Sequence, residues 1–226
     1  MNIVAFESST HHLSVALWCD GRLSERCATV PNAGSAQLLP WFSALLAEAG
    51  MVPAQLDGLA YGAGPGAFTG MRLSCAVVQG LALGLDLPVV GVSSLEALAL
   101  QADAPRVLAC IDARMNEVYY GHYSVSAGSV DTLQAPRCVA PDAVAAPAQA
   151  GWTGCGDGFR AYPDLLRAQR AAVRADLAPS AAAIARLAAP RLQRGEGGDA
   201  ALAVPLYVRD KVALTTSERL ARGGSR

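Results

Sequence analysis

The chain begins with the apolar run Asn2-Ile-Val-Ala-Phe-Glu-Ser8, continues with Leu13-Ser-Val-Ala-Leu-Trp18, and turns at Asp20-Gly21 into the stretch 22–30. Apolar and polar residues alternate in the second run, as they do in a strand with one buried face. An Asp-Gly pair between two such runs is a strong hairpin signal. We therefore predict three strands joined as an antiparallel meander.

Helices and strands alternate after this meander. The expected elements are a helix, a strand, a helix, a strand and a helix, at 36–49, 56–62, 71–85, 88–92 and 93–101. Parallel strands need a crossover connection, which a helix supplies. The order predicts a mixed α/β sheet, antiparallel first and parallel later. A dinucleotide-binding doubly wound fold is excluded, because it alternates from its first strand.

The same order then begins again. We expect three strands, a weak helix, a strand and a last helix, at 106–113, 117–125, 129–138, 142–147, 151–155 and 180–194. A duplicated unit is the simplest explanation. We accordingly assign 1–103 to an N-terminal lobe and 104–195 to a smaller C-terminal lobe. Residues 196–226 are expected to pack back on the first lobe and to end in a mobile tail.

Composition excludes several classes of protein. Of 226 residues, 52% are hydrophobic and 16% charged, which predicts a folded chain with a large core. The formal net charge of −1 lacks the basic excess of a protein that grips nucleic acid by itself. The only lysine is Lys211, so there is no phosphate-binding loop of the kind that needs a Lys after a glycine-rich turn.

The compartment follows from the cysteines and from the absence of targeting signals. The six cysteines form no Cys-x-x-Cys pair, which makes a structural zinc site improbable. We interpret them as reduced, mostly buried thiols in a cytoplasmic protein. The N-terminal residues lack the basic region and cleavage site of a signal peptide, and no uninterrupted apolar run is long enough for a membrane span.

A glycine-rich turn, Gly62-Ala-Gly-Pro-Gly-Ala-Phe-Thr-Gly-Met-Arg72, lies between a predicted strand and a predicted helix. Glycines let a ligand approach the backbone, and a helix N-terminus attracts anions. One interpretation is a nucleotide contact, with the candidate residues Gly64, Gly66, Thr69 and Arg72. The other is a tight turn in which Arg72 forms an ion pair at the surface.

Small residues line one side of the helix that follows. Ala76, Gly80 and Gly84 recur every four residues, although each helical Gly costs about 1 kcal/mol relative to Ala. The helix at 36–49 is apolar over a wider arc than the about 100° that packing on one sheet requires. Either the two helices pack on each other, or they pair with another molecule. The candidate interface residues are Leu39, Trp41, Leu46, Ala76, Gly80 and Gly84.

The sequence contains no recognisable set of catalytic residues. His11 and His12 are adjacent, so on a strand they point to opposite faces and cannot chelate one metal ion together. The sequence contains neither His-Glu-x-x-His nor Gly-x-Ser-x-Gly. Glu7 precedes a polar turn, where a capped hairpin is the simpler interpretation, and Asp112 and Arg114 suit a local ion pair. We assign no catalytic residue and no metal ligand.

Eight blocks of the sequence, spread from residue 1 to about 213, resemble the TsaB (YeaZ) family of bacterial proteins. They are, in order, Ile3-Val4-Ala5-Phe6-Glu7-Ser8-Ser9-Thr10, Leu13-Ser14-Val15-Ala16-Leu17, Gln37-Leu38-Leu39-Pro40, Leu59-Ala60-Tyr61-Gly62-x-Gly64-Pro65-Gly66-x-Phe68-Thr69-Gly70-x-Arg72, Gln79-Gly80-Leu81-Ala82-Leu83-Gly84, Gly91-Val92-Ser93-Ser94-Leu95, Ile111-Asp112-Ala113-Arg114-Met115-x-Glu117-Val118-Tyr119 and Pro205-Leu206-Tyr207-Val208-Arg209.

The resemblance implies a two-lobed actin/hexokinase-like, ribonuclease-H-like fold built from duplicated βββαβα units. It implies a role in forming the N6-threonylcarbamoyl group on the adenosine beside the anticodon, in tRNAs that read codons beginning with adenine. The resemblance also implies that the chain is non-catalytic. It would bind a catalytic paralogue, TsaD, through two helices of the N-terminal lobe, and an ATPase, TsaE, would join that pair.

The same resemblance indicates what this chain does not hold. ATP or ADP and the metal ion belong to the partners or to a shared interface, and tRNA is reached through the complex. The sequence leaves open whether the chain pairs with a second copy of itself, as a homodimer, or with the paralogue. Glu7 stands where actin-type folds usually carry a metal-holding Asp, and Gly34-Ser35-Ala36 stands where many members have a His. The alternative function is a stand-alone ATP-dependent enzyme or a peptidase.

Overall fold

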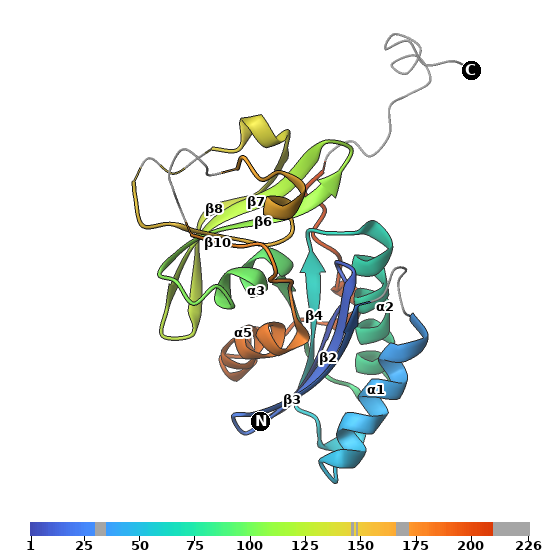
Figure 1. Cartoon of the computed structure of the whole chain (residues 1–226). Helices are drawn as coiled ribbons and strands as arrows, with labels where there is room; N and C mark the ends of the chain where they lie inside the picture. The colour runs from blue at the N-terminus through green and yellow to red at the C-terminus, as the bar shows by residue number, and fades with distance from the viewer. Residues whose placement is uncertain (30–34, 146, 148, 166–171, 210–226) are drawn as a thin grey trace, which may run out of the picture.

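Two five-stranded sheets with helices packed on them make up the computed structural model (Figure 1). It describes residues 1–29, 35–145, 147, 149–165 and 172–209. The strands of sheet A are β1 (Asn2–Glu7), β2 (His12–Cys19), β3 (Arg22–Thr29), β4 (Gly58–Gly64) and β5 (Val89–Ser93). Their order in the sheet is β3-β2-β1-β4-β5.

The register of sheet A follows the predicted meander. β1 pairs antiparallel with β2, so that Asn2 lies opposite Cys19, and β2 pairs antiparallel with β3. β4 is parallel to β1, and β5 is parallel to β4. The change from antiparallel to parallel pairing occurs where the first helix enters the chain, because a helical crossover is what a parallel neighbour requires.

Sheet B repeats this arrangement. Its strands are β6 (Arg106–Arg114), β7 (Glu117–Ser126), β8 (Ser129–Val139), β9 (Thr153–Cys155) and β10 (Ala172–Arg174). Their order is β10-β9-β6-β7-β8, with an antiparallel meander of β6, β7 and β8, and with β9 and β10 added in parallel. The predicted duplication is thereby confirmed, and the chain has the two-lobed actin-like, ribonuclease-H-like fold.

Helices cover both faces of sheet A. In Figure 1, α1 (Ser35–Glu48) and α2 (Phe68–Leu85) lie on one side and α5 (Ala181–Gln193) on the other. α3 (Ser94–Leu100) packs between the two sheets, and α4 (Gly158–Ala161) is a single turn against β6. Short 3-10 turns complete the described elements, at Pro53–Gln55, Pro141–Ala143 and Ala200–Leu202.

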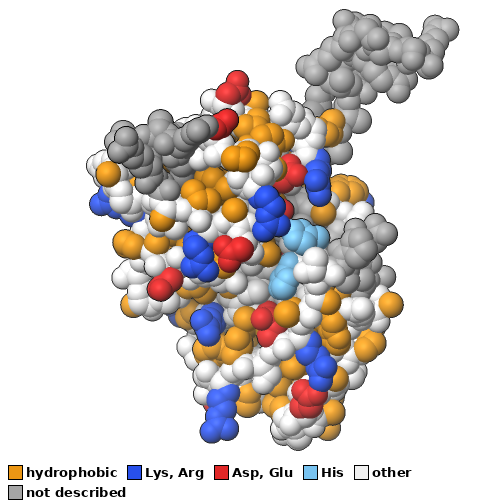
Figure 2. Space-filling model, in the orientation of Figure 1, with side chains coloured by type: hydrophobic (Ala, Val, Ile, Leu, Met, Phe, Trp, Pro, Cys, Tyr) orange, Lys and Arg blue, Asp and Glu red, His pale blue; other side chains and the backbone are white. Residues whose placement is uncertain are grey.

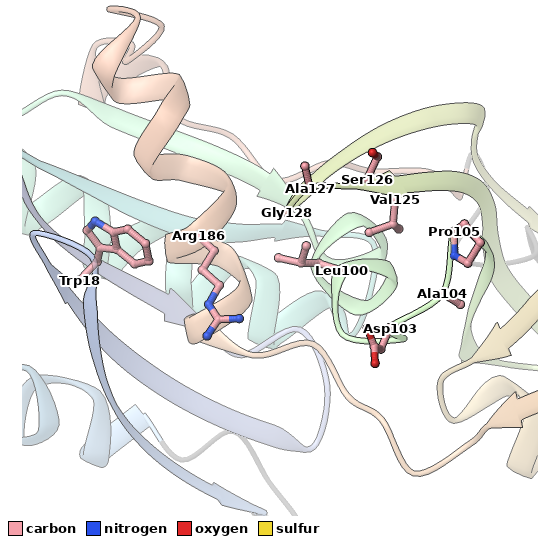
Figure 3. Close-up of a pocket in the computed structure, with 10 residues that line it drawn as sticks. All are labelled: Trp18, Leu100, Asp103, Ala104, Pro105, Val125, Ser126, Ala127, Gly128 and Arg186. Atoms are coloured by element: carbon pink, nitrogen blue, oxygen red, sulfur yellow. The ribbon is translucent and has the colours of Figure 1, made fainter.

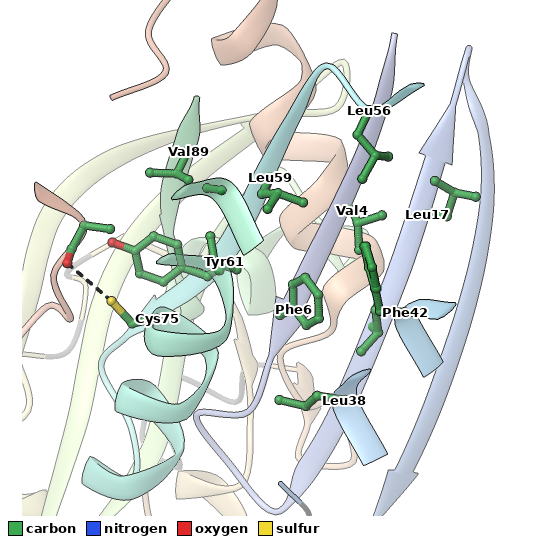
Figure 4. Packing of buried hydrophobic residues seen from close by; sticks show 14 of the residues in the cluster. Val4, Phe6, Leu17, Leu38, Phe42, Leu56, Leu59, Tyr61, Cys75 and Val89 are labelled. Atoms are coloured by element: carbon green, nitrogen blue, oxygen red, sulfur yellow. Dashed lines mark hydrogen bonds between the residues drawn. The ribbon is translucent and has the colours of Figure 1, made fainter. Parts of the chain in front are cut away.

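Alternation along β1 divides the core of the first lobe into two layers. Val4 and Phe6 face α1 and α2, and the Phe6 ring stacks on Phe42 with centroids 6.1 Å apart (Figure 4). Ile3 and Ala5 point the other way, into the layer beneath α5. Successive side chains of a strand face opposite sides of its sheet, so a strand that is buried on both faces is apolar throughout.

The position of α5 corrects the predicted lobe boundary. α5 falls inside 104–195, which the sequence assigned to the second lobe, yet Ile184 and its neighbours pack on the buried face of sheet A. Two strands of that sheet also cap the helix: the Ala181 N–H donates to Ser14 Oγ at 2.8 Å, and the Ala182 N–H to Glu25 Oε1 at 2.9 Å. The first lobe therefore needs α5, because its parallel strands bury both faces.

Other differences from the sequence prediction involve short elements. The weak helix expected at 142–147 is only a 3-10 turn, Pro141–Ala143, and α2 begins at Phe68 instead of Met71. α4 and β10 have four and three residues, too few to show a period in the sequence. Residues 198–206 lie against the first lobe, whereas the predicted tail falls outside the described residues.

Candidate functional site

The glycine turn packs against the turn between β1 and β2. A Cβ added at Gly66 or Gly70 would overlap the carbonyl oxygen of Ser9 or Ser8, and the Ala67 N–H donates to Ser9 O at 2.6 Å. At Gly64, with φ +105°, a Cβ would meet the sulfur of Met71. Other residues of the chain thus cover Gly64 and Gly66, so the space that these two glycines leave is not open to the nucleotide that the sequence predicted.

Thr69 and Arg72 remain exposed at the start of α2. The Arg72 guanidinium carbon lies 3.8 Å from the Phe68 ring centroid, and Arg72 Nε donates to Tyr207 Oη at 2.9 Å. Stacking on aromatic rings and the hydrogen bond to Tyr207 therefore hold Arg72, and within the described residues it forms no ion pair with a carboxylate. The residue before the helix, Ala67, supplies no side-chain cap, so the first backbone N–H groups of α2 have no side-chain acceptor there.

Glu7 is completely buried at the end of β1. Ser94 Oγ donates to Glu7 Oε2 at 3.0 Å, and the Ser9 N–H donates to Oε1 at 2.5 Å. Burial raises the pKa of this carboxyl above its ordinary value, although the hydrogen bonds from Ser9 and Ser94 oppose that shift. A Cβ at Gly62 would overlap the carboxyl group, so glycine at that position makes room for Glu7.

Residues of both lobes line the groove between them, from the turn between β1 and β2 on one side and from the end of β6 and the residue before α4 on the other. Ser9, Thr10 and His11 face Asp112, Arg114 and Asp157 across a hollow of about 100 Å³. The Asp112 N–H donates to Asp157 Oδ1 at 3.0 Å. Arg114 Nη1 lies 3.1 Å from Asp112 Oδ2, which confirms the predicted local ion pair. No group of three metal-binding side chains occurs within the part of the chain that the structure describes.

A more open hollow, of about 610 Å³, lies on another part of the molecule. Trp18 from β2, Arg186 from α5 and Asp103 after α3 border it, together with the turn between β7 and β8 (Figure 3). None of the residues predicted to be functional lines this hollow. Figure 2 shows basic and acidic side chains interspersed on the visible face, with no single basic patch there.

The small-residue stripe of α2 faces outward. Ala76, Gly80 and Gly84 are exposed, and a Cβ added at Gly80 or Gly84 would have no atom within 4 Å. Leu83, on the same side of the helix, is 64% exposed. The interpretation in which this stripe packs on the helix at 36–49 is therefore wrong. α2 is also long and apolar enough for a membrane span by length and composition alone, a property shared with core helices of soluble proteins.

The candidate interface residues of α1 divide into exposed and buried ones. Leu39 is 50% exposed, whereas Trp41 is partly buried against the core. Leu46 is only 3% exposed and belongs to the core, so its assignment to an interface is corrected. The apolar arc of α1 is wide because Leu38, Phe42, Leu45 and Leu46 all fill the layer above sheet A.

Comparisons with known proteins assign the family. Residues 30–216 match the family model described as TsaD, tRNA N6-adenosine threonylcarbamoyltransferase. The chain is 35% identical over 223 residues to the tRNA threonylcarbamoyladenosine biosynthesis protein TsaB of Escherichia coli K12, covering 94% of this chain and 96% of that protein. The chain belongs to the TsaB (YeaZ) family. The TsaB of Haemophilus influenzae is 41% identical over 124 residues, about half of each chain.

Solved TsaB-family structures agree with the fold. YeaZ from Pseudomonas aeruginosa superposes with a TM-score of 0.84 at 39% identity, covering 91% of this chain and 99% of that one. A second Pseudomonas aeruginosa structure, described as an uncharacterized protein with similarity to peptidase YeaZ, gives a TM-score of 0.86 at 40% identity and covers 92% and 99% of the two chains. About nine tenths of this chain thus shares the fold of these proteins.

Proposed function

We propose that this chain is a non-catalytic scaffold subunit in the formation of N6-threonylcarbamoyladenosine in tRNA, and that it acts by binding a TsaD-type transferase in the cytoplasm. The names of its relatives support the pathway. The open stripe of α2 carries the proposed binding role, because a Cβ added at Gly80 or Gly84 would meet no atom within 4 Å, so the helix backbone is open to a partner there. Small residues let two helices approach closely, and that close approach compensates for their low helix propensity.

The enclosure of Glu7 supports a role without catalysis. An acid that holds a metal ion must present its oxygens to the cleft, but both oxygens of Glu7 accept hydrogen bonds inside the fold. Burial also favours the neutral acid, which is a poor metal ligand. A stand-alone ATP-dependent enzyme or peptidase is the alternative, and the name of one structural relative mentions a peptidase.

Substitution at the centre of the stripe tests the proposal. Gly80→Arg places a long charged side chain on the open face, and Arg favours helix more than Gly, so the lone chain is expected to stay folded. In a reconstituted assay of threonylcarbamoyl transfer to tRNA with all partners, we expect product to fall at least tenfold. Leu133→Arg, on the exposed side of β8, is the matched control.

Binding measurements separate the two functions. Isothermal titration of the transferase with wild-type chain and with Gly80→Arg should show loss of pairing in the variant only. Retained pairing with undiminished product contradicts the scaffold proposal. Tight binding of Mg-ATP by the lone chain, with product formed in the absence of the transferase, favours the enzyme alternative.

We also propose that Thr69 and Arg72 contact a nucleotide that is shared with the partner complex, which includes a TsaE-type ATPase. The start of α2 supports this, since its N-terminal N–H groups lack a side-chain cap and Arg72 is exposed beside them. Arg72→Ala should weaken ATP or ADP binding by the assembled complex about tenfold. Tyr207→Phe, which removes only the hydroxyl acceptor of Arg72, is the control. Unchanged affinity in Arg72→Ala contradicts this role.

A further inference from the structure

Residues 198–209, here called the strap, run along α2 and are fixed to the first lobe by hydrogen bonds. Ala203 O accepts from Gln79 Nε2 at 3.0 Å, and Val204 O accepts from Tyr61 Oη at 3.0 Å. The Leu206 N–H donates to Ala63 O at 2.7 Å. At its far end, Arg209 pairs with Glu117 at 2.7 Å in the second lobe. The backbone of the strap is therefore held in place along its length.

Alternation in this strap leaves apolar side chains in solvent. Ala203 is 8% exposed and faces α2, whereas its neighbours Leu202 and Val204 are 75% and 67% exposed. Leu202 is the last residue of the 3-10 turn, and the backbone is extended at Ala203, so Val204 points to the side opposite the Ala203 side chain. Exposed apolar side chains that lie together mark interaction surfaces more often than isolated ones do.

The strap borders the open stripe of α2. Cys75 and Gln79 face Ala203, and Ala76 and Gly80 follow them by one residue, which is a rotation of about 100° around the helix. The exposed stripe consequently lies next to Leu202 and Val204, with the α2 side chains that touch the strap between them. The two apolar surfaces form one continuous face.

Area shows why α2 alone does not suffice as a binding surface. A helix of 18 residues is about 27 Å long and about 10 Å across, so one exposed side of it offers less than about 300 Å². A stable protein pair buries about 800 Å² on each partner. The neighbours of α2 must supply the remainder, and these are α1 with Leu39 on one flank and the strap on the other.

A hollow of about 340 Å³ lies between the C-terminal end of α2 and the strap. Leu83 and Ala200 contribute its apolar wall, and Asp86 and Asp199 contribute carboxylates. Asp199 Oδ1 accepts the Ala201 N–H at 2.8 Å, whereas Asp86 is exposed and forms no ion pair with another described residue. A basic side chain is the group whose charge complements this end of the face.

We propose that the strap, through Leu202 and Val204, and the hollow bounded by Asp86 and Asp199 form the second half of the partner-binding face. The partner is the TsaD-type transferase, which covers this half with an apolar surface that ends in a Lys or Arg side chain. This inference rests on the proposed function, which uses the α2 stripe only. The family-model match indicates that the transferase shares the fold of this chain, so it carries helices equivalent to α1 and α2.

Two charge substitutions test the apolar part. Leu202→Asp and Val204→Asp are expected to weaken binding of the transferase at least tenfold each by isothermal titration. Both side chains point into solvent, so the unfolding midpoint of the lone chain should stay the same. Leu133→Asp, on β8 and 57% exposed, introduces the same charge away from the face and should leave the dissociation constant unchanged.

Neutralising an acid tests the hollow. Asp86→Asn should weaken binding several-fold at low salt and should flatten the dependence of the dissociation constant on salt concentration, since one ion pair is lost. Asp131→Asn, an exposed acid of β8, is the matched control. Equal salt dependence in wild type and Asp86→Asn overturns the basic-group part of the inference.

The outcomes distinguish the inference from the function on which it rests. If Gly80→Arg abolishes pairing while both strap variants bind within twofold of wild type, the inference is wrong and the scaffold function stands. If Gly80→Arg pairs normally, the scaffold function itself fails. Hydrogen exchange of the wild-type complex gives an independent reading: protection of residues 200–207 on adding the transferase supports the inference, and unchanged exchange there overturns it.

Discussion

Glu7 illustrates how a single residue can be closed off from the cleft that its position suggests. The carboxyl group lies between Gly62 and Ser94, and it accepts hydrogen bonds from the Ser9 N–H and the Ser94 hydroxyl. A buried ionised carboxylate is costly, so the fold favours the protonated acid and the pKa rises. The extra methylene of Glu relative to Asp lets its head group reach Ser94, which belongs to α3.

The raised pKa of Glu7 predicts a pH-dependent stability. The contribution of Glu7 to the stability of the fold is fully present below the pKa that this carboxyl has in the unfolded chain. That contribution is lost as the pH rises through the higher pKa of Glu7 in the folded state. At pH values above the folded and the unfolded pKa of Glu7, each unit by which folding raises the pKa lowers the free energy of unfolding by about 1.4 kcal/mol. In Glu7→Gln the side chain stays neutral at every pH. The free energy of unfolding of the variant, relative to that of wild type, should therefore increase as the pH is raised from 5 to 8.

Urea unfolding at both pH values measures this difference in free energy. Asp131→Asn, which neutralises an exposed acid of β8, is the matched control. A constant difference between Glu7→Gln and wild type from pH 5 to pH 8 would mean that the pKa of Glu7 is not raised in the fold.

α2 uses glycine in two physically different ways. Gly70 lies where the helix touches the Ser8 carbonyl, so a side chain there has no room. Gly80 and Gly84 lie on the open side, where a side chain would meet nothing within 4 Å. All three positions are glycine in the sequence. The packing around them shows that the fold requires glycine at Gly70 and does not require it at Gly80 or Gly84.

Two glycine substitutions on α2 should therefore have opposite effects. Gly80→Ala adds a helix-favouring residue without a clash and should raise the free energy of unfolding by up to about 1 kcal/mol. Gly70→Ala forces a Cβ against the Ser8 carbonyl and should lower it by about 1–3 kcal/mol. Denaturant unfolding of the lone chain measures both. A destabilised Gly80→Ala would show that the open face is covered in solution.

At the scale of the whole molecule, the first lobe is built from two separate parts of the chain. Sheet A has α1 and α2 on one face, and α5 closes the other face. The chain leaves this lobe after α3 and returns to it before α5, and the two crossing points are adjacent, because Gln101 Nε2 donates to Ala178 O at 2.9 Å. The second lobe is thus an insertion between α3 and α5.

Deleting the second lobe tests this architecture. Residues 1–103 joined by a short Gly-Ser linker to 178–209 retain both faces of sheet A, and we expect one cooperative unfolding transition in urea. Residues 1–103 alone leave Ile3, Ala5 and Val90 uncovered and should aggregate or bind a hydrophobic dye. Cooperative unfolding of the 1–103 fragment would contradict the role of α5.

The strands of both meanders, the long helices, the duplication and the family could all be predicted from the amino-acid sequence, because alternation and helical period are local properties and the motif blocks are contiguous. The packing of α5 on sheet A, the burial of Leu46 in the core and the contact of Gly66 with Ser9 became visible in the folded molecule alone. The openness of the α2 stripe and the position of Leu202 and Val204 beside it became visible there too. Such contacts join residues far apart in the chain, and whether an apolar side chain is covered depends on what the rest of the fold places above it.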